Sequence, residues 1–391
     1  MKPEYFSDIE IWDFSIYFLY FFLVYVILIY SSKYFLRKDN NFIYYYYLCI
    51  LSSYTIILSL DLQIKILPSF PDTIKYSNYI KGNGNFQYQG FEYLAFLFKW
   101  LSFNSVLVYL LFNLMITQIG IMMVWKAWLI YNRQNLIPIE YQRVFLILSA
   151  IYPLAIIYSL VPLRESYFII GMGLFLIGIF KKKIINIPLL IGIFIIFLIR
   201  EHYILFVLIV LFIKYSKNFK YRIILYIGAI PLIFAILDLI AYSFFNISIT
   251  PEGLAYLKTA KAEAWQGHSA GTFPPVNWNT WFDVFIYLPK LFLQFLFAPF
   301  PIIVKTQFWT KYAYFIDGIY VTLLVVLLIL HIKKIKNYKF WILIFIIYIG
   351  LSSMYEFLLS GAVRHRYFAV LMILPLVSSL YRIKLSKNTF Q

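Results

Sequence analysis

Long apolar runs recur along the entire 391-residue chain, and no polar segment between them is large enough to build a hydrophobic core of its own. Hydrophobic residues make up 63% of the chain and charged residues only 13%, whereas soluble globular domains carry roughly 25% charged residues. The sequence therefore predicts an all-α, polytopic integral membrane protein with a single membrane domain over residues 1–391. About eleven spans are expected, at 14–30, 42–60, 104–125, 144–161, 166–180, 184–200, 202–213, 223–245, 312–330, 340–355 and 367–380.

The distribution of basic residues predicts which loops face inward. With the N-terminus outside and the C-terminus inside, twenty of the 34 Lys and Arg residues lie in inner loops or the inner tail, with only Asp39 and Glu140 as inner acids. The isoelectric point of about 9.5 therefore reflects membrane topology and does not indicate nucleic acid binding. Cys49 is the only cysteine, which excludes an internal disulfide. Pro153 is expected to kink its span.

Two apolar segments do not fit simple spans and are expected to form helices that lie in the plane of the outer membrane surface. The segment 91–103 is short and is interrupted by Glu92 and Lys99. In the segment 281–297, polar residues recur at helical spacing on one face. These polar residues are Asp283, Tyr287, Lys290 and Gln294. Both segments either anchor loops or form the floor of a substrate groove, and Lys290 is a candidate substrate contact in the second case.

The expected outer loops 61–103 and 246–311 are longer than the inner loops and are predicted to form the substrate face. Three outer hairpins also bring basic side chains to the outer leaflet, where ionisable residues are costly and usually paired or functional. These residues are Arg164, Arg200, His202, Arg364, His365 and Arg366. Because a guanidinium binds phosphate oxygens in pairs, the set indicates a lipid phosphate site. In the alternative, neighbouring acids such as Glu165 or Glu201 neutralise the arginines.

A leaving phosphate requires an acceptor hydroxyl and a base to activate it. Asp72 follows Pro71 in the first outer loop, with Tyr76 about one helical turn later, and is the first candidate for that base. Glu92 is the second candidate. Alternatively, Asp72 caps the N-terminus of a helix.

Other chemistry has little support in the sequence. No phosphate-binding loop, dinucleotide fingerprint or zinc-ligand spacing occurs, so no cofactor or metal is required and a divalent cation is unsupported. His268 lies in a Gly-rich part of the second outer loop. That part either closes over a substrate or serves as a solvated linker.

The order of these motifs resembles bacterial membrane sugar transferases of the GT-C type and the polymerases of O-antigen, capsule and exopolysaccharide. The residues that carry the resemblance are Pro71-Asp72 with Tyr76, Gly90 to Tyr93, Pro162 to Ser166, Arg200 with Tyr203, Phe297 to Pro301, and Arg364 to Tyr367 with Pro375. The resemblance implies a GT-C-like helical bundle in the bacterial inner membrane. It also implies a polyprenyl-linked sugar substrate, with Asp72 as base and with Arg164, Arg200, Arg364 and Arg366 holding the polyprenyl pyrophosphate. In GT-C enzymes the loop follows the first span, whereas here it follows the second, which favours the polymerases.

We therefore expect a repeat-unit polymerase that acts on polyprenyl-(pyro)phosphate-linked saccharides at the outer leaflet, alongside other proteins of polysaccharide assembly. A GT-C transferase that adds single sugars is the second interpretation. The third is a flippase or transporter of lipid-linked sugars. A transporter should show internal repeats and polar residues near mid-membrane, whereas here the polar residues gather toward one face.

Overall fold

The structure is a computed structural model that describes residues 11–68, 71–82, 90–132, 137–183, 185–216, 248–264, 271–299 and 308–380, with 235, 238 and 242. The described chain is helical throughout, and its only β-type contact is an isolated bridge between Thr272 and Leu358. The predicted all-α class is confirmed. The predicted span at 223–245 and His268 lie outside the described residues, apart from residues 235, 238 and 242.

The chain divides into two compact units, which are described separately. The first unit comprises residues 1–201, 323–337 and 370–391, and the second comprises 202–322 and 338–369. Helices of the first unit are α1 (Ile11–Phe35), α2 (Asn40–Ile64), α3 (Pro71–Lys81), α4 (Phe91–Leu101), α5 (Val106–Tyr131), α6 (Ile139–Ile151), α7 (Pro153–Leu160), α8 (Glu165–Phe180), α9 (Ile187–Ile199) and the short α15 (Ile332–Ile335).

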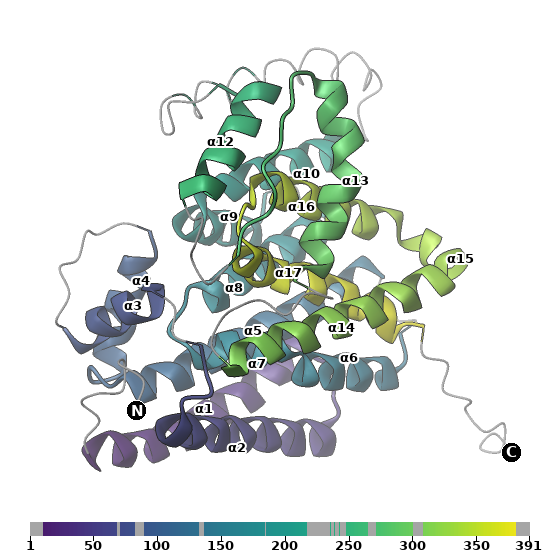
Figure 1. Ribbon diagram of the computed structural model, residues 1–391. Coiled ribbons are helices and arrows are strands. Elements are labelled where there is room, and N and C mark those ends of the chain that lie inside the picture. Colours follow the sequence, from purple (N-terminus) through teal and green to yellow (C-terminus); the bar gives the residue numbers. More distant parts are fainter. Residues whose placement is uncertain are drawn as a thin grey trace, which may run out of the picture. The chain divides into compact units, whose positions relative to one another are not determined.

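Helix α5 is the centre of the first unit. Nearly all of its side chains are buried, and it packs against α1 and α8, while α8 in turn packs against α9 (Figure 1). Gly192 allows the close contact between α8 and α9, because a Cβ at this position would lie 2.5 Å from the main-chain N of Phe175. This contact lets the middle parts of α8 and α9 pack closely.

Four helical segments are long and apolar enough to cross a membrane: Trp12–Phe35, Asn40–Ile64, Val106–Tyr131 and Lys311–Leu330. Helices α6 and α7 form a possible fifth span, bent by 61° at the break before Pro153, as the proline predicts. The shorter apolar helices α8, α9 and α16 match three other predicted spans in position. The structure therefore supports a helical membrane protein with four or five spans by length, and a count of eleven remains a prediction.

Loops predicted to share a side of the membrane also meet in the first unit. Arg143 pairs with Asp39 at 2.6 Å. The guanidinium of Arg37 donates a hydrogen bond to the main-chain O of Ile137, and the main-chain N of Arg37 donates one to the side-chain oxygen of Gln142. These residues all belong to loops or helix ends assigned to the inner side. Their contacts agree with that grouping.

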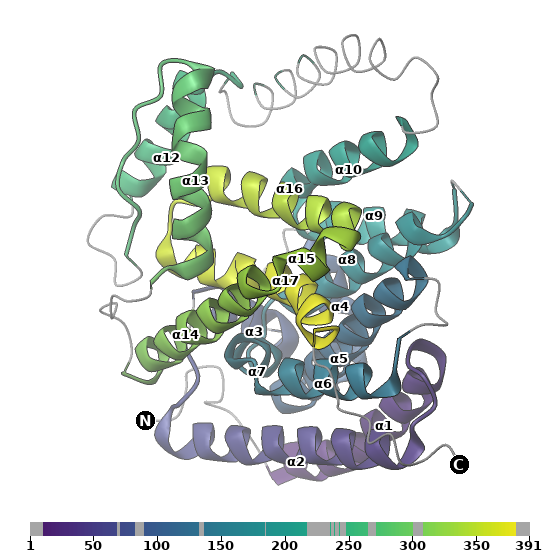
Figure 2. The ribbon, with the colours of Figure 1, turned by 90° about the vertical axis from the view of Figure 1, so that its right-hand side faces the viewer.

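The second unit is built on α10 (Ile204–Ser216), α12 (Pro251–Ala264), α13 (Trp281–Phe297) and α16 (Lys339–Tyr355). It also contains the parts within its bounds of η2 (Glu201–Tyr203), α14 (Phe308–Leu330), η3 (Lys336–Tyr338) and α17 (Leu359–Ser378). Helix α13 packs against α12 and α16, as both views of the ribbon show (Figure 2). Trp278 is fully buried in the small core that these helices share. The predicted helices at 91–103 and 281–297 are confirmed as α4 and α13. Their position in a membrane plane remains a prediction.

Asp283 has a local role at the start of α13 that the sequence pattern did not predict. Its side chain accepts a hydrogen bond from the Thr280 main-chain N (2.8 Å), while the Thr280 hydroxyl accepts one from the Asp283 main-chain N (3.3 Å). This reciprocal pair is a capping box, which satisfies main-chain donors that the first turn leaves open. The hydrogen bonds from Thr280 lower the pKa of the Asp283 carboxyl.

Candidate functional site

The first predicted outer loop folds into α3 and α4, and these helices place a buried carboxylate between them. Glu92 is 4% exposed and lies in the first turn of α4. Its Oε1 accepts a hydrogen bond from the Tyr79 hydroxyl at 2.9 Å and contacts Lys75 Nζ at 3.0 Å, both from α3. The hydrogen bond to Glu92 raises the pKa of Lys75. The carboxylate is thus held by two donors of α3.

The Glu92 helix begins against the turn that carries Arg200. Gly90, just before α4, has a φ of +51°, and a Cβ there would lie 2.4 Å from the main-chain O of Leu198. On the same turn, Arg164 Nη1 donates to the main-chain O of Ile199 at 3.4 Å. The predicted first outer loop, the turn at 161–165 and the turn at 198–201 therefore meet.

Asp72 and Tyr76 lie on α3 in the same loop. Asp72 is partly exposed and is the second residue of α3, one position inside the helix that the capping interpretation expected it to precede, while Tyr76 is 7% exposed. Because Glu92 is the more deeply held of the two carboxylates, the geometry gives it a larger part in the site than the sequence did.

Two of the predicted phosphate-binding arginines are held by buried carboxylates. In the first unit, Arg200 Nη2 contacts Glu165 Oε1 at 2.6 Å, and both residues are 3% exposed. In the second unit, Arg366 is fully buried and bonds to Asp317 and to the main-chain O of Leu296 (2.9 Å). These contacts correspond to the charge-neutralising alternative. In this arrangement neither guanidinium is presented to a substrate phosphate.

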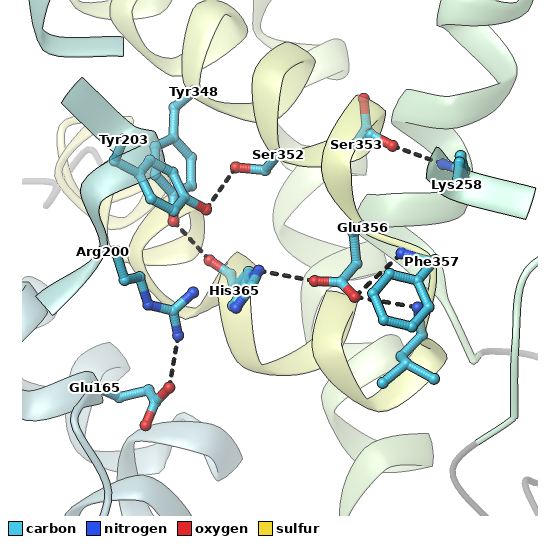
Figure 3. Close-up of polar contacts among 11 residues, drawn as sticks. Glu165, Arg200, Tyr203, Lys258, Tyr348, Ser352, Ser353, Glu356, Phe357 and His365 are labelled. Carbon is cyan, nitrogen blue, oxygen red and sulfur yellow. Dashed lines mark hydrogen bonds and ion pairs between the residues drawn. The ribbon is translucent and has the colours of Figure 1, made fainter. Parts of the chain in front are cut away.

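The remaining basic candidates of the second unit lie on η2 (His202), on α13 (Lys290) and in the first two turns of α17 (Arg364 and His365). His365 Nδ1 pairs with Glu356 Oε2 at 2.8 Å, and Arg364 beside it is partly exposed (Figure 3). The ring of His202 stacks on Tyr355 with 4.5 Å between the centroids. Lys290 is exposed on α13 and lies over the ring of Tyr287.

Lys258 is a buried cation that the sequence analysis missed. It lies on α12, is 3% exposed, and donates to the main-chain O of Ser353 at 2.8 Å (Figure 3). Burial lowers its pKa to about 8, against a smaller raising effect of Glu356. Ala255 and Ala262 are buried on the same helix, three residues before and four after Lys258. This helical spacing is the signal by which the sequence places Lys258 on the buried face.

Neither a metal-binding group among the described residues nor a similar known protein was found. Within the described ranges, no group of three or more His, Cys, Asp or Glu side chains could hold a metal ion. No family model, curated protein or solved structure matches the chain. Conclusions about function therefore depend on the residues and their geometry.

Proposed function

We propose that this protein is a membrane-embedded sugar transferase of cell-surface polysaccharide assembly, with polymerisation of polyprenyl-linked repeat units at the outer leaflet as its reaction. The observation that supports the proposal is the organised carboxylate of the first outer loop. Glu92 is buried and held by Tyr79 and Lys75, and its helix begins against the Leu198 carbonyl, two residues before Arg200. The proposed reacting groups thus lie within one compact unit.

The reaction needs a base on the acceptor side. A hydroxyl of the acceptor sugar attacks the anomeric carbon of the donor, the bond from that carbon to the phosphate oxygen breaks, and the polyprenyl (pyro)phosphate leaves with the electron pair. A carboxylate takes the hydroxyl proton, and Glu92 or Asp72 serves as that base. General-base catalysis of this type contributes about 10²–10⁴-fold to rate.

The leaving group needs positive charge. Of the two phosphate-binding candidates among the arginines of the first unit, Arg164 is partly exposed and Arg200 is buried, and the Arg164 guanidinium donates to the main-chain O of Ile199, next to Arg200. We assign the phosphate contact to Arg164, while Arg200 positions the turn through Glu165. In the second unit the buried Arg366 has a structural role, and the phosphate role of Arg364, His202 and His365 stays a prediction from the sequence.

Incubation of the purified protein with polyprenyl-linked repeat units tests the proposal. A ladder of products supports the polymerase. One added sugar supports the GT-C transferase, and no product supports a flippase or transporter of the same lipids.

Matched variants separate the roles of the two carboxylates. Glu92→Gln and Asp72→Asn each keep side-chain size but remove the base, and the residue that serves as base should lose about 10²-fold or more in rate. Glu252→Gln changes an exposed carboxylate of the second outer loop and is the control. Full activity in both Glu92→Gln and Asp72→Asn would remove both residues from the mechanism. Arg164→Ala and Arg364→Ala test the phosphate contacts in the same assay.

A further inference from the structure

The second unit contains a partly enclosed cavity of about 610 Å³. Its walls come from α10, α12 and the end of α16, with His202, Ile249 and Trp281 at its margins. Most of the lining side chains are Leu, Ile, Phe or Met. Cavities that bind small ligands typically measure about 300–1,000 Å³ and combine apolar walls with a few placed polar groups.

The polar residues that line this cavity differ in charge and in their existing contacts. Tyr203 and Ser352 share a hydrogen bond of 2.9 Å, and His202 stacks on Tyr355. Lys258 is the one lysine or arginine among the lining residues that the structure describes, and no acidic residue lines the cavity there. The wall is therefore apolar with a cationic group at one place.

Glu356 is the carboxylate whose charge acts on Lys258, and it forms its ion pair with another residue. Glu356 pairs with His365 at 2.8 Å and accepts hydrogen bonds from the main-chain N of Phe357 (3.2 Å) and Leu358 (3.1 Å) (Figure 3). Lys258 in turn donates to the neutral carbonyl of Ser353. A buried ammonium opposite a neutral carbonyl is costly, and an anionic group that enters the cavity would lower that cost.

We propose that this cavity binds the hydrocarbon chain of an anionic lipid, whose negatively charged head-group oxygens pair with Lys258. The apolar walls match the chain, and Lys258 matches the head group. This binding step is independent of the proposed transferase reaction and requires no turnover to measure.

The test uses native mass spectrometry of the full chain in amphipol, with decyl, dodecyl and tetradecyl phosphate as probes. Two further arms are dodecanol, which carries the chain without the charge, and inorganic phosphate, which carries the charge without the chain. We expect one dodecyl phosphate to bind more tightly than either. Each methylene should strengthen binding about fourfold, corresponding to about 0.8 kcal/mol, until the cavity is full.

Variants test where the head group and the hydrocarbon chain of the ligand bind. Lys258→Met keeps side-chain length but removes the charge and should weaken dodecyl phosphate binding about tenfold or more. Lys261→Met, nearly one turn further along α12 and outside the cavity lining, is the matched control and should change binding less than about threefold. Ile209→Trp fills part of the cavity and should remove the chain-length dependence. Unspecific partitioning is subtracted as the binding that Ile209→Trp retains.

Three results would overturn the proposal. Equal binding of dodecyl phosphate by Lys258→Met and the wild type would show that the head group lies elsewhere. Binding of inorganic phosphate as tight as that of dodecyl phosphate would make this a site for free anions. An unchanged chain-length series in Ile209→Trp would place the hydrocarbon outside the cavity.

Discussion

The ion pair of Glu165 and Arg200 gives the most direct test of how the first unit is packed. Its Nη2–Oε1 distance is 2.6 Å, both residues are 3% exposed, and the guanidinium also lies over the ring of Phe168. Removal of one partner leaves an uncompensated buried charge, which costs about 3–5 kcal/mol. We therefore expect Glu165→Leu and Arg200→Met each to lower the free energy of unfolding by that amount.

The double variant should behave differently. With Glu165→Leu and Arg200→Met together, neither charge of the pair remains, and replacement of a buried pair by apolar side chains of similar size is often neutral or stabilising by about 1–4 kcal/mol. The two single losses should therefore be strongly non-additive.

The assay is a denaturant titration in detergent micelles, followed by circular dichroism, on the wild type, both single variants and the double variant. Arg143→Met is the control, because Arg143 pairs with Asp39 but its side chain is 45% exposed. This substitution should lower the free energy of unfolding by no more than about 1 kcal/mol. Single losses below about 1 kcal/mol, or losses that simply add, would refute the coupling. If the double variant is stable, its rate in the assay of the proposed transferase reaction reports on the Glu165–Arg200 pair without a loss of fold.

The remaining predictions concern other parts of the chain. The pKa of Lys258 is about 8 in the folded protein and 10.5, its ordinary value, in the unfolded chain, so the unfolded chain binds more protons between these two pH values. The free energy of unfolding of the wild type should therefore rise by about 3 kcal/mol as the pH increases from about 8 to 10.5. The free energy of unfolding of Lys258→Met should not rise in this way. Unfolding titrations across that range check this, and parallel curves would contradict it. Gly90→Ala should destabilise the first unit by about 2–4 kcal/mol, because of its positive φ and the 2.4 Å contact with the Leu198 carbonyl; an unchanged denaturation midpoint would be inconsistent with that contact. Thr280→Ala should lower the free energy of unfolding by about 1 kcal/mol, because it removes the capping box of α13. Thr259→Ala is the control, because the Thr259 hydroxyl donates to the main-chain O of Val276 and caps no helix. Amide hydrogen exchange at the start of α13 should become faster in Thr280→Ala only.

Several features of the fold could be predicted from local sequence. The apolar runs at 14–30, 42–60, 104–125 and 312–330 coincide with long helices, and Pro153 lies at the predicted break. Helices α4 and α13 were also expected from their apolar patterns, although the capping role of Asp283 was not. In each case the determining signal lies within one helix, where hydrophobic periodicity and proline act locally.

The candidate site depended much more on tertiary contacts. The sequence offered both Glu165 and Glu201 as acids near the arginines, and the packing of α8 against α9 brought Glu165 to Arg200, 35 residues away. Glu92 became the central carboxylate of the first outer loop because α3 and α4 fold onto each other around it.

The sequence by itself determined an all-helical, membrane-type chain and the positions of its longest helices, and it offered candidate residues for phosphate binding and proton transfer. Only the tertiary structure decided which charges are paired and that Lys258 lies at an apolar cavity. The physical reason is that helix formation and hydrophobicity follow from neighbouring residues, whereas an ion pair or a cavity wall requires segments far apart in the chain to pack together.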